Sequence, residues 1–221
     1  MNRVVVFLKY PEPGRVKTRL AAEIGSEAAA RLSKHFAEVT VTSADALNLP
    51  VDISFDPPER EAEVRAWLGP LRQYNPQAGT DLGQRMCRAF EQAFTRGAGR
   101  VALTGTDAPD RPAQFLVEAL ERLEKHDVVL GPATDGGYHL IAMCQDTFTP
   151  EVFEGIAWST PAVLVQTLDV LRRAGRSVWV LPPWRDIDDK AGLDAYLEGH
   201  PETAGFLEDD QDDAEPKGEK P

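Results

Sequence analysis

Residues 4–20 read VVVFLKYPEPGRVKTRL, and this stretch decides the fold class. Residues 4–8 form a continuous apolar run, as expected of a strand that is buried on both faces of a sheet. The polar segment 9–20 follows and leads into an Ala-rich region, from 16 to about 47, whose apolar residues recur at helical spacing. A buried strand that runs through a polar loop into a helix is the first unit of an α/β fold.

Strand and helix signals alternate along the rest of the chain. The clearest is residues 82–96, which are amphipathic and end at two glycines. Alternation of this kind predicts a three-layer α/β/α sandwich around a mostly parallel mixed sheet. The predicted strands are 4–8, 51–55, 71–75, 101–104, 128–130, 138–143 and 177–181, and the other predicted helices are 59–68, 112–125 and 161–174.

The length and charge of the chain limit the number of domains and the kinds of partner that we expect. The chain has 221 residues, which suits one α/β domain, and it shows no internal repeat or linker. We therefore expect one domain over residues 1–207. The stretch 208–221 has seven acidic and two basic residues and one apolar residue, so it is predicted to be a disordered tail. The formal charge of −12 argues against a nucleic-acid binder that works through a broad basic face.

The apolar segments and the cysteines indicate where in the cell we expect the protein. No stretch approaches the roughly 18 apolar residues of a membrane helix. The N-terminal apolar run is short and has no small-residue cleavage site, so it does not predict a signal peptide. Cys87 and Cys144 form neither a disulfide framework nor a zinc pattern. We expect a cytoplasmic protein that works without a membrane.

The segment KYPEPGRVKTRL is unusually basic for an acidic chain. It carries Gly14 together with Lys9, Arg15, Lys17 and Arg19. A glycine loop that enters a helix presents backbone N–H groups to an anion, and Lys and Arg add charge. The segment therefore favours a phosphate site, against the alternative of a solvated turn. It matches neither the Walker pattern nor GxGxxG, which argues against a Rossmann-type oxidoreductase.

Carboxylates follow two predicted strands. Asp107 and Asp110 come directly after the strand 101–104. Strand-end carboxylates suit Mg²⁺, which takes one or two protein carboxylates plus substrate phosphates. The alternative is that one of them is the N-cap of the next helix, and this alternative fits Asp110 better than Asp107. Asp186 and Asp188 alternate along an extended segment, so they point to one side and could share a cation. Their alternative is again an N-cap, for the helix after residue 190.

Two glycine-containing loops complete the candidate site. The turn at Asp135, Gly136 and Gly137 leads to Tyr138 and His139, and its paired glycines permit close approach of a ligand. A bare turn between strands is the alternative. The loop 79–83, GTDLG, precedes a helix and could seat a base or ribose.

Six segments occur in order across residues 7–189: FLKYPEPGRVKTRLA, QAGTDLGQRM, TGTDAPD, GPATDGGYHLIAM, IAWST and DIDD. In them the chain resembles the DUF2064 family of bacterial proteins, within the GT-A superfamily of nucleotide-diphospho-sugar transferases. More widely it is similar to molybdenum-cofactor guanylyltransferases and phospholactate guanylyltransferases. The chain departs from these patterns at Asp189, where Thr is expected, and at Asp107, which stands alone rather than in an Asp-x-Asp pair.

The resemblance implies a GT-A fold, a divalent cation (Mg²⁺ or Mn²⁺) and a nucleotide donor. It places the nucleotide at Gly14, Arg15, Lys17, Arg19, Gly79, Asp81, Leu82 and Gly83. It places the acceptor at Asp135, Gly136, Gly137 and Tyr138, the metal at Asp107, Asp186 and Asp188, and the catalytic roles at Lys17, Asp107 and Asp135.

The function expected from this resemblance is metal-dependent transfer from an activated nucleotide, an NTP or an NDP-sugar, to a small-molecule acceptor. Nucleotidyl and glycosyl transfer both remain open. Glycosyl transfer to a hydroxyl needs a base, for which Asp135 or His139 could serve. The alternatives are a non-catalytic nucleotide-binding or regulatory protein and a hydrolase of nucleotide sugars. The oligomeric state stays open, with a homodimer as one option.

Overall fold

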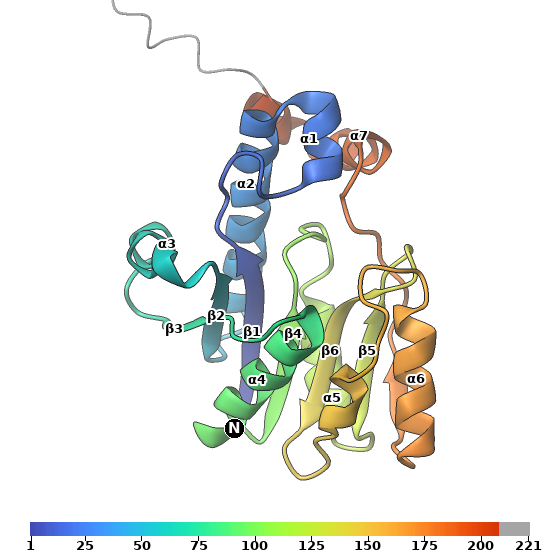
Figure 1. Cartoon of the computed structure of the whole chain (residues 1–221). Coiled ribbons are helices and arrows are strands. Elements are labelled where there is room, and N and C mark those ends of the chain that lie inside the picture. Colours follow the sequence, from blue (N-terminus) through green and yellow to red (C-terminus); the bar gives the residue numbers. More distant parts are fainter. Residues whose placement is uncertain (208–221) are drawn as a thin grey trace, which may run out of the picture.

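The computed structural model describes residues 1–207, and the predicted acidic tail 208–221 lies outside the described residues. Its centre is a seven-stranded sheet with the order β3-β2-β1-β4-β6-β5-β7 (Figure 1). The strands are β1 (Asn2–Lys9), β2 (Val51–Asp56), β3 (Gln73–Pro76), β4 (Arg100–Thr104), β5 (Val128–Pro132), β6 (Tyr138–Cys144) and β7 (Val178–Val180).

The sheet is mixed because of β6. Strands β1 to β4 pair in parallel, and β5 pairs in parallel with β7. β6 runs antiparallel to both β4 and β5. The short turn between β5 and β6 permits this pairing, whereas parallel neighbours need long crossovers. The predicted mostly parallel mixed sheet is confirmed.

Helices form the crossovers. They are α1 (Thr18–Ile24), α2 (Ser26–Asp45), α3 (Glu61–Leu68), α4 (Leu82–Thr95), α5 (Gln114–Arg122), α6 (Val163–Arg173) and α7 (Lys190–Gly199), with 3-10 turns at η1 (Pro58–Arg60), η2 (Pro150–Phe153) and η3 (Pro201–Leu207). The helix-rich segment from residue 16 is two helices rather than one, because Gly25 adopts a φ of 86° between them. No helix within residues 1–207 is long and apolar enough to cross a membrane.

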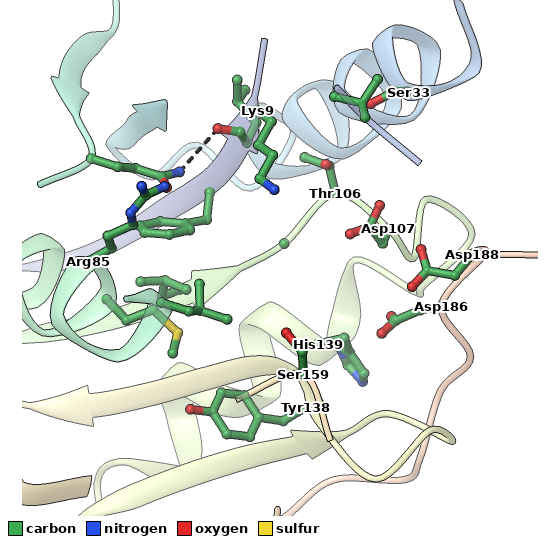
Figure 2. A pocket seen from close by; sticks show the side chains of 18 of the residues that line it. Lys9, Ser33, Arg85, Thr106, Asp107, Tyr138, His139, Ser159, Asp186 and Asp188 are labelled. Carbon is green, nitrogen blue, oxygen red and sulfur yellow. Dashed lines mark hydrogen bonds between the residues drawn. The ribbon is translucent and has the colours of Figure 1, made fainter. Parts of the chain in front are cut away.

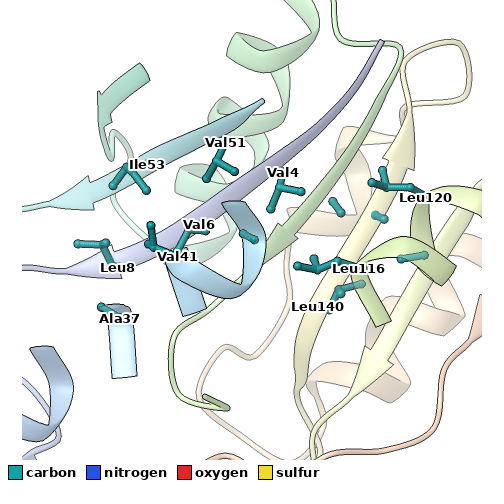
Figure 3. Packing of buried hydrophobic residues seen from close by; sticks show 14 of the residues in the cluster. Val4, Val6, Leu8, Ala37, Val41, Val51, Ile53, Leu116, Leu120 and Leu140 are labelled. Carbon is teal, nitrogen blue, oxygen red and sulfur yellow. The ribbon is translucent and has the colours of Figure 1, made fainter. Parts of the chain in front are cut away.

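Alternate residues of β1 supply two separate cores. Val4, Val6 and Leu8 pack in one apolar cluster with α2, α3 and α5 (Figure 3). Val5 points to the other face and packs in a second cluster with Phe90 of α4 and Leu171 of α6. Because both faces of the strand are buried, the continuous apolar run of the sequence is explained. The result is the predicted three-layer sandwich.

A third cluster, called here the satellite core, lies beyond the carboxyl end of β1, where α1 and α7 meet one end of α2 (Figure 1). Phe36 of α2 and Tyr196 of α7 meet edge to face, with ring centroids 5.2 Å apart. Ile187, in the loop before α7, is fully buried in the same cluster. The satellite core therefore holds the loop 185–189 over the carboxyl edge of the sheet. Its members are Leu20, Leu32, Phe36, Ile187, Leu193 and Tyr196.

Candidate functional site

A cavity of about 640 Å³ opens at the carboxyl ends of β1 and β4. This is the edge at which open α/β sheets bind ligands. Asp107, Asp186 and Asp188 lie together at one end of it, and Arg85 lies at the other (Figure 2). Charged and polar residues in its lining include Lys9, Arg15, Lys17, Gln77, Arg85, Asp107, Asp186 and Asp188.

Lys17 lies within the acidic cluster. Its ammonium donates to Asp107 Oδ1 at 2.6 Å and to the carbonyl oxygen of Ile187 at 2.8 Å. Asp188 Oδ1 is 3.6 Å away. The Lys17 side chain is only 3% exposed and lies over the Phe36 ring, 5.2 Å from its centroid. The structure thus brings together three predicted site residues that are up to 171 positions apart in the sequence, since 188 − 17 = 171.

Local backbone geometry makes this meeting possible. Lys17 precedes α1 in the left-handed region, with φ 44° and ψ 47°. Ile187 donates its backbone N–H to the carbonyl oxygen of Asp107 at 2.8 Å, while its own carbonyl oxygen accepts from Lys17. Because the Ile187 side chain is buried in the satellite core, that core positions the carboxylates on either side of it.

The carboxylates repel one another. Burial, followed by the charges of Asp107 and Asp188, raises the pKa of Asp186 to about 7. Burial and the charge of Asp107 also raise the pKa of Asp188. Both groups would ionise more readily beside a further cation. The site is therefore electrostatically prepared for positive charge.

A divalent cation fits this donor set when substrate phosphates complete its coordination. Within residues 1–207, no group of three or more His, Cys, Asp or Glu side chains is arranged to hold a metal ion by itself. Mg²⁺ commonly takes only one or two carboxylates and completes its shell with phosphates and water. Asp107, Asp186 and Asp188 line the cavity and could supply such ligands.

The lining of the cavity also includes apolar side chains, which suit contact with a planar ring. They include Phe7, Met86 and Leu103. The Gln77 amide nitrogen donates to the carbonyl oxygens of Leu8 and Ser54, both at 3.1 Å, so the amide orientation is set.

Arg85 lies beside Gln77 and was missed by the sequence reasoning, as was Gln77. Its Nη1 is 3.2 Å from Asp56 Oδ1 and 3.5 Å from Gln77 Oε1. Both residues fall inside the motif QAGTDLGQRM. The spacing from Gln77 to Arg85 carries no simple signal, since the first directly follows β3 and the second lies on α4.

Residues of the loop before α4 either shape the start of that helix or line the cavity. Asp81 caps α4, because its Oδ1 accepts from the backbone N–H of Gln84 at 2.8 Å. A Cβ on Gly83 would lie 2.2 Å from the carbonyl oxygen of Phe153, so this glycine packs the helix closely against η2. A Cβ on Gly79, whose φ is 145°, would lie 2.7 Å from Gln84 Cβ. The loop residues that line the cavity are Thr80, Asp81 and Leu82.

In the basic loop, some of the predicted phosphate-binding residues line the cavity and others do not. Arg15 and Lys17 line the cavity, and Arg15 Nη1 is 3.3 Å from Glu12. Gly14 is exposed, with φ 77° and no neighbour near its Cβ position. Arg19 is exposed on α1, and its charge partly offsets the rise in the pKa of Asp188.

The predicted acceptor turn lies at the margin of the cavity. Asp135 is exposed, and its Oδ1 accepts from the N–H of Gly137 at 2.9 Å. Gly136, at φ 93°, approaches Pro161 so closely that a Cβ would lie 2.4 Å from its carbonyl oxygen. Of the four predicted acceptor residues, Tyr138 lines the cavity itself.

His139 lines the cavity but is poorly suited to act as a base. Its side chain is buried, and burial, followed by the charge of Arg111, lowers the pKa of His139 to about 3. An imidazole with so low a pKa is neutral at pH 7 and accepts a proton weakly.

The helix-cap alternatives are resolved by the structure. The cap for α5 predicted at Asp110 is wrong: α5 begins after Ala113 with no side-chain cap. Asp110 instead accepts from Trp184 Nε1 at 2.9 Å and from Arg185 Nη2 at 3.2 Å. For α7 the cap is Asp189, whose Oδ1 accepts from the N–H of Gly192 at 2.8 Å. Asp186 and Asp188 are therefore left to face the cavity.

Comparison with known proteins shows which family and fold the chain shares. The family model described as "Uncharacterized protein conserved in bacteria (DUF2064)" matches residues 39–160. A protein of Desulfovibrio desulfuricans G20, described as a "putative nucleotide-diphospho-sugar transferase", is 37% identical, with a TM-score of 0.88 over 93% of each chain. No curated protein matches the chain.

More distant solved structures share the fold alone. The 4-diphosphocytidyl-2C-methyl-D-erythritol synthase of Anaerococcus prevotii DSM 20548 is 10% identical, with a TM-score of 0.61 over 90% of this chain and 96% of its own. A CMP:2-keto-3-deoxy-manno-octonic acid synthetase complexed with CTP is 12% identical, with a TM-score of 0.56 over 91% and 98%.

Proposed function

We propose, from the premise that this chain belongs to the DUF2064 family, that it is a divalent-metal-dependent transferase that uses an activated nucleotide as donor. Its fold is that of nucleotide-sugar transferases and nucleotidyltransferases. The observation that carries the proposal is the cluster of Lys17 with Asp107 and Asp188 in the cavity at the carboxyl edge of the sheet.

The two ends of the cavity suit the two ends of a nucleotide. The apolar surface near Gln77 and Arg85 fits a base, and the cluster around Lys17 fits phosphates. Distant relatives of this fold are consistent with such a ligand. One was solved with CTP, and Rv0371c from Mycobacterium tuberculosis H37Rv was solved with manganese.

The residues of the chain then divide the work. Asp107, Asp186 and Asp188 would hold a divalent cation, which when bound would neutralise charge on the phosphate oxygens of the leaving group. Lys17 and Arg15 stabilise the same charge by direct contact. The walls of the cavity align the acceptor with the reacting atom. If the acceptor is a hydroxyl, we assign the base to Asp135, because burial lowers the pKa of His139 to about 3 and its imidazole accepts a proton weakly.

A thermal-shift panel tests the proposal. NTPs, NDPs and NDP-sugars are each added with and without Mg²⁺ or Mn²⁺, since a ligand of the native state raises the Tm. We expect a metal-dependent shift with one nucleotide class. An NTP response indicates nucleotidyl transfer, and an NDP-sugar response indicates glycosyl transfer.

A pair of matched variants makes the panel specific. Asp107→Ala removes a carboxylate of the cavity, and Asp146→Ala removes an exposed carboxylate just after β6. The first should lose the metal-dependent shift and keep its fold, and the second should behave as wild type. If Asp107→Ala binds nucleotide and metal as tightly as wild type, the assigned metal site is wrong.

A further inference from the structure

Lys17 lies close to three oxygen atoms at the acidic end of the cavity. Its ammonium is 2.6 Å from Asp107 Oδ1, 2.8 Å from the carbonyl oxygen of Ile187 and 3.6 Å from Asp188 Oδ1. Carboxylate and carbonyl oxygens are also the ligands that Mg²⁺ and Mn²⁺ prefer in proteins. The ammonium therefore lies among the oxygens to which a divalent cation would bind.

The two carboxylates, unlike the ammonium, are open to the cavity. The side chains of Asp107 and Asp188 are 51% and 46% exposed, and both line the cavity, where they lie close together (Figure 2). The Lys17 side chain is buried and packs over the ring of Phe36 in the satellite core. A cation from solvent therefore reaches the carboxylates from the cavity, while Lys17 reaches them from the side of the satellite core.

The backbone helps to hold Lys17 in this position. The φ of 44° at Lys17 lies in the left-handed region, which residues other than glycine rarely adopt. The carbonyl oxygen of Lys17 accepts from the N–H of Ala21 at 2.8 Å, and this bond ties the residue to α1. The position of the ammonium is therefore set by the fold as well as by its own ion pairs.

The ammonium of Lys17 opposes the binding of a metal ion to the same oxygens. Because Nζ is 2.6 Å from Asp107 Oδ1, a Mg²⁺ that binds this oxygen at about 2.1 Å lies within about 5 Å of Nζ, whatever its direction. Positive charges at this distance repel, and the ammonium also offsets part of the negative charge that attracts the metal.

Phosphate groups change this balance of charge. A nucleotide brings negative oxygens that interact favourably with both the ammonium and the metal ion. Lys17 itself lines the cavity, so phosphates bound there are within its reach. Phosphates should therefore favour metal binding more strongly here than at a site built from carboxylates without a lysine.

We propose that Lys17 makes metal binding depend on the nucleotide: its ammonium competes with the divalent cation for Asp107 and Asp188, and the nucleotide phosphates relieve this competition. The proposal rests on the proposed function, because it takes the phosphates to bind beside Lys17. Metal and nucleotide then bind cooperatively, and each raises the affinity of the other by the same factor. The site accepts the metal together with the nucleotide and discriminates against the free cation.

The test is a titration of the full chain with Mn²⁺ alone, in which electron paramagnetic resonance measures the free ion. Lys17→Met removes the ammonium and keeps an unbranched apolar side chain over Phe36. We expect Lys17→Met to bind Mn²⁺ at least about tenfold more tightly than wild type, because a positive charge within about 5 Å of the metal is removed. Equal or weaker binding by the variant would overturn the proposal.

Two controls locate the effect. Lys34→Met removes an exposed lysine of α2 that pairs with Glu38 at 4.0 Å, and it should bind Mn²⁺ as wild type does. The same gain in Lys34→Met would show an effect of net charge and would overturn the proposal. The double variant Lys17→Met, Asp107→Asn should lose the gain, because the metal loses a ligand. If the double variant keeps the gain, the ion binds elsewhere and the proposal fails.

Thermal unfolding gives a second readout. Without metal, Lys17→Met should have a lower Tm than wild type, because Asp107 and Asp188 lose their counter-charge. Mn²⁺ should raise the Tm of Lys17→Met more than that of wild type, and an equal rise would contradict the competition. If Lys17→Met does not fold without metal, Lys17→Gln, whose amide can still donate to Asp107, takes its place in both measurements.

A nucleotide titration measures the dependence directly. The nucleotide that responds in the thermal-shift panel should raise the Mn²⁺ affinity of wild type by a larger factor than that of Lys17→Met. An equal factor in the two proteins would overturn the proposal. If no nucleotide binds to wild type, the proposed function fails, while the titration with Mn²⁺ alone still decides whether Lys17 competes with the metal.

Discussion

Charged side chains are buried in two regions of this molecule, at opposite ends of the sheet's parallel strands. Near the start of β2, Asp52 is 1% exposed and sits between two arginines. Its carboxylate is 2.5 Å from Arg3 Nη1 and 3.3 Å from Arg96 Nη1. At the carboxyl edge, Asp186 lies among other carboxylates, and Arg111 makes no ion pair within the described residues.

The difference separates charges that serve the fold from charges that serve a ligand. At Asp52 the opposite charges are on the same chain, and the cluster is complete when the protein folds. At the carboxyl edge like charges are gathered in the lining of a cavity, where Lys17 pairs with Asp107 and Asp188. Such an arrangement costs stability, and it is retained where a ligand supplies the missing charge.

Removing the complete cluster should have the largest effect on stability. Asp52→Ala leaves two arginines without their buried partner, and we expect it to lower the free energy of unfolding by about 3–5 kcal/mol. Urea denaturation measures the change. Ligand binding of the folded fraction should be unchanged, because the cluster is remote from the cavity. A loss below about 1 kcal/mol would remove the contrast drawn between the two regions.

The carboxyl edge should respond to pH in the opposite sense to an ordinary ion pair. The pKa of Asp186 is raised from 3.8 to about 7, so between these values the folded chain holds a proton that the unfolded chain has released. The free energy of unfolding without ligand should therefore fall as pH rises through this window, by up to about 1.4 kcal/mol per pH unit. Asp186→Asn should lack this component. Stability curves of wild type and variant that run parallel from pH 4 to 7 would contradict it.

The sequence predicted the fold well because its signals are local. The apolar run at the start of β1 and the amphipathic α4 lie within a residue or two of their predicted positions. It also singled out Lys17 and the carboxylates, since polar residues after buried strands gather at one edge of a parallel sheet.

Other features depend on contacts that no local pattern records. The satellite core joins Phe36 to Ile187. The backbone hydrogen bond from Ile187 to Asp107 spans 80 positions, since 187 − 107 = 80. The bulge at His139 depends on the register of β5 against β6. Asp110 was expected to cap α5, but Trp184 and Arg185, more than 70 residues away, bind it instead. Arg111 has no sequence signal, because only its burial makes it unusual.

The smallest effect concerns adjacent carboxylates of one segment, DIDD. Asp189 caps α7 through the N–H of Gly192, and Asp188 faces the cavity. Asp189→Ala should lower the free energy of unfolding by about 1 kcal/mol, the usual value of an N-cap, and leave metal-dependent nucleotide binding unchanged. Asp188→Ala should raise the free energy of unfolding, because it removes a repelled carboxylate from the edge. It should weaken metal-dependent nucleotide binding, because it removes a proposed ligand from the metal. Urea denaturation and nucleotide titration on both variants measure the two effects together. If Asp189→Ala weakened metal-dependent nucleotide binding as much as Asp188→Ala, the separate roles assigned to Asp189 as a helix cap and to Asp188 as a metal ligand would be wrong. Charges that serve the fold and charges that serve a ligand would then not be separate in this segment.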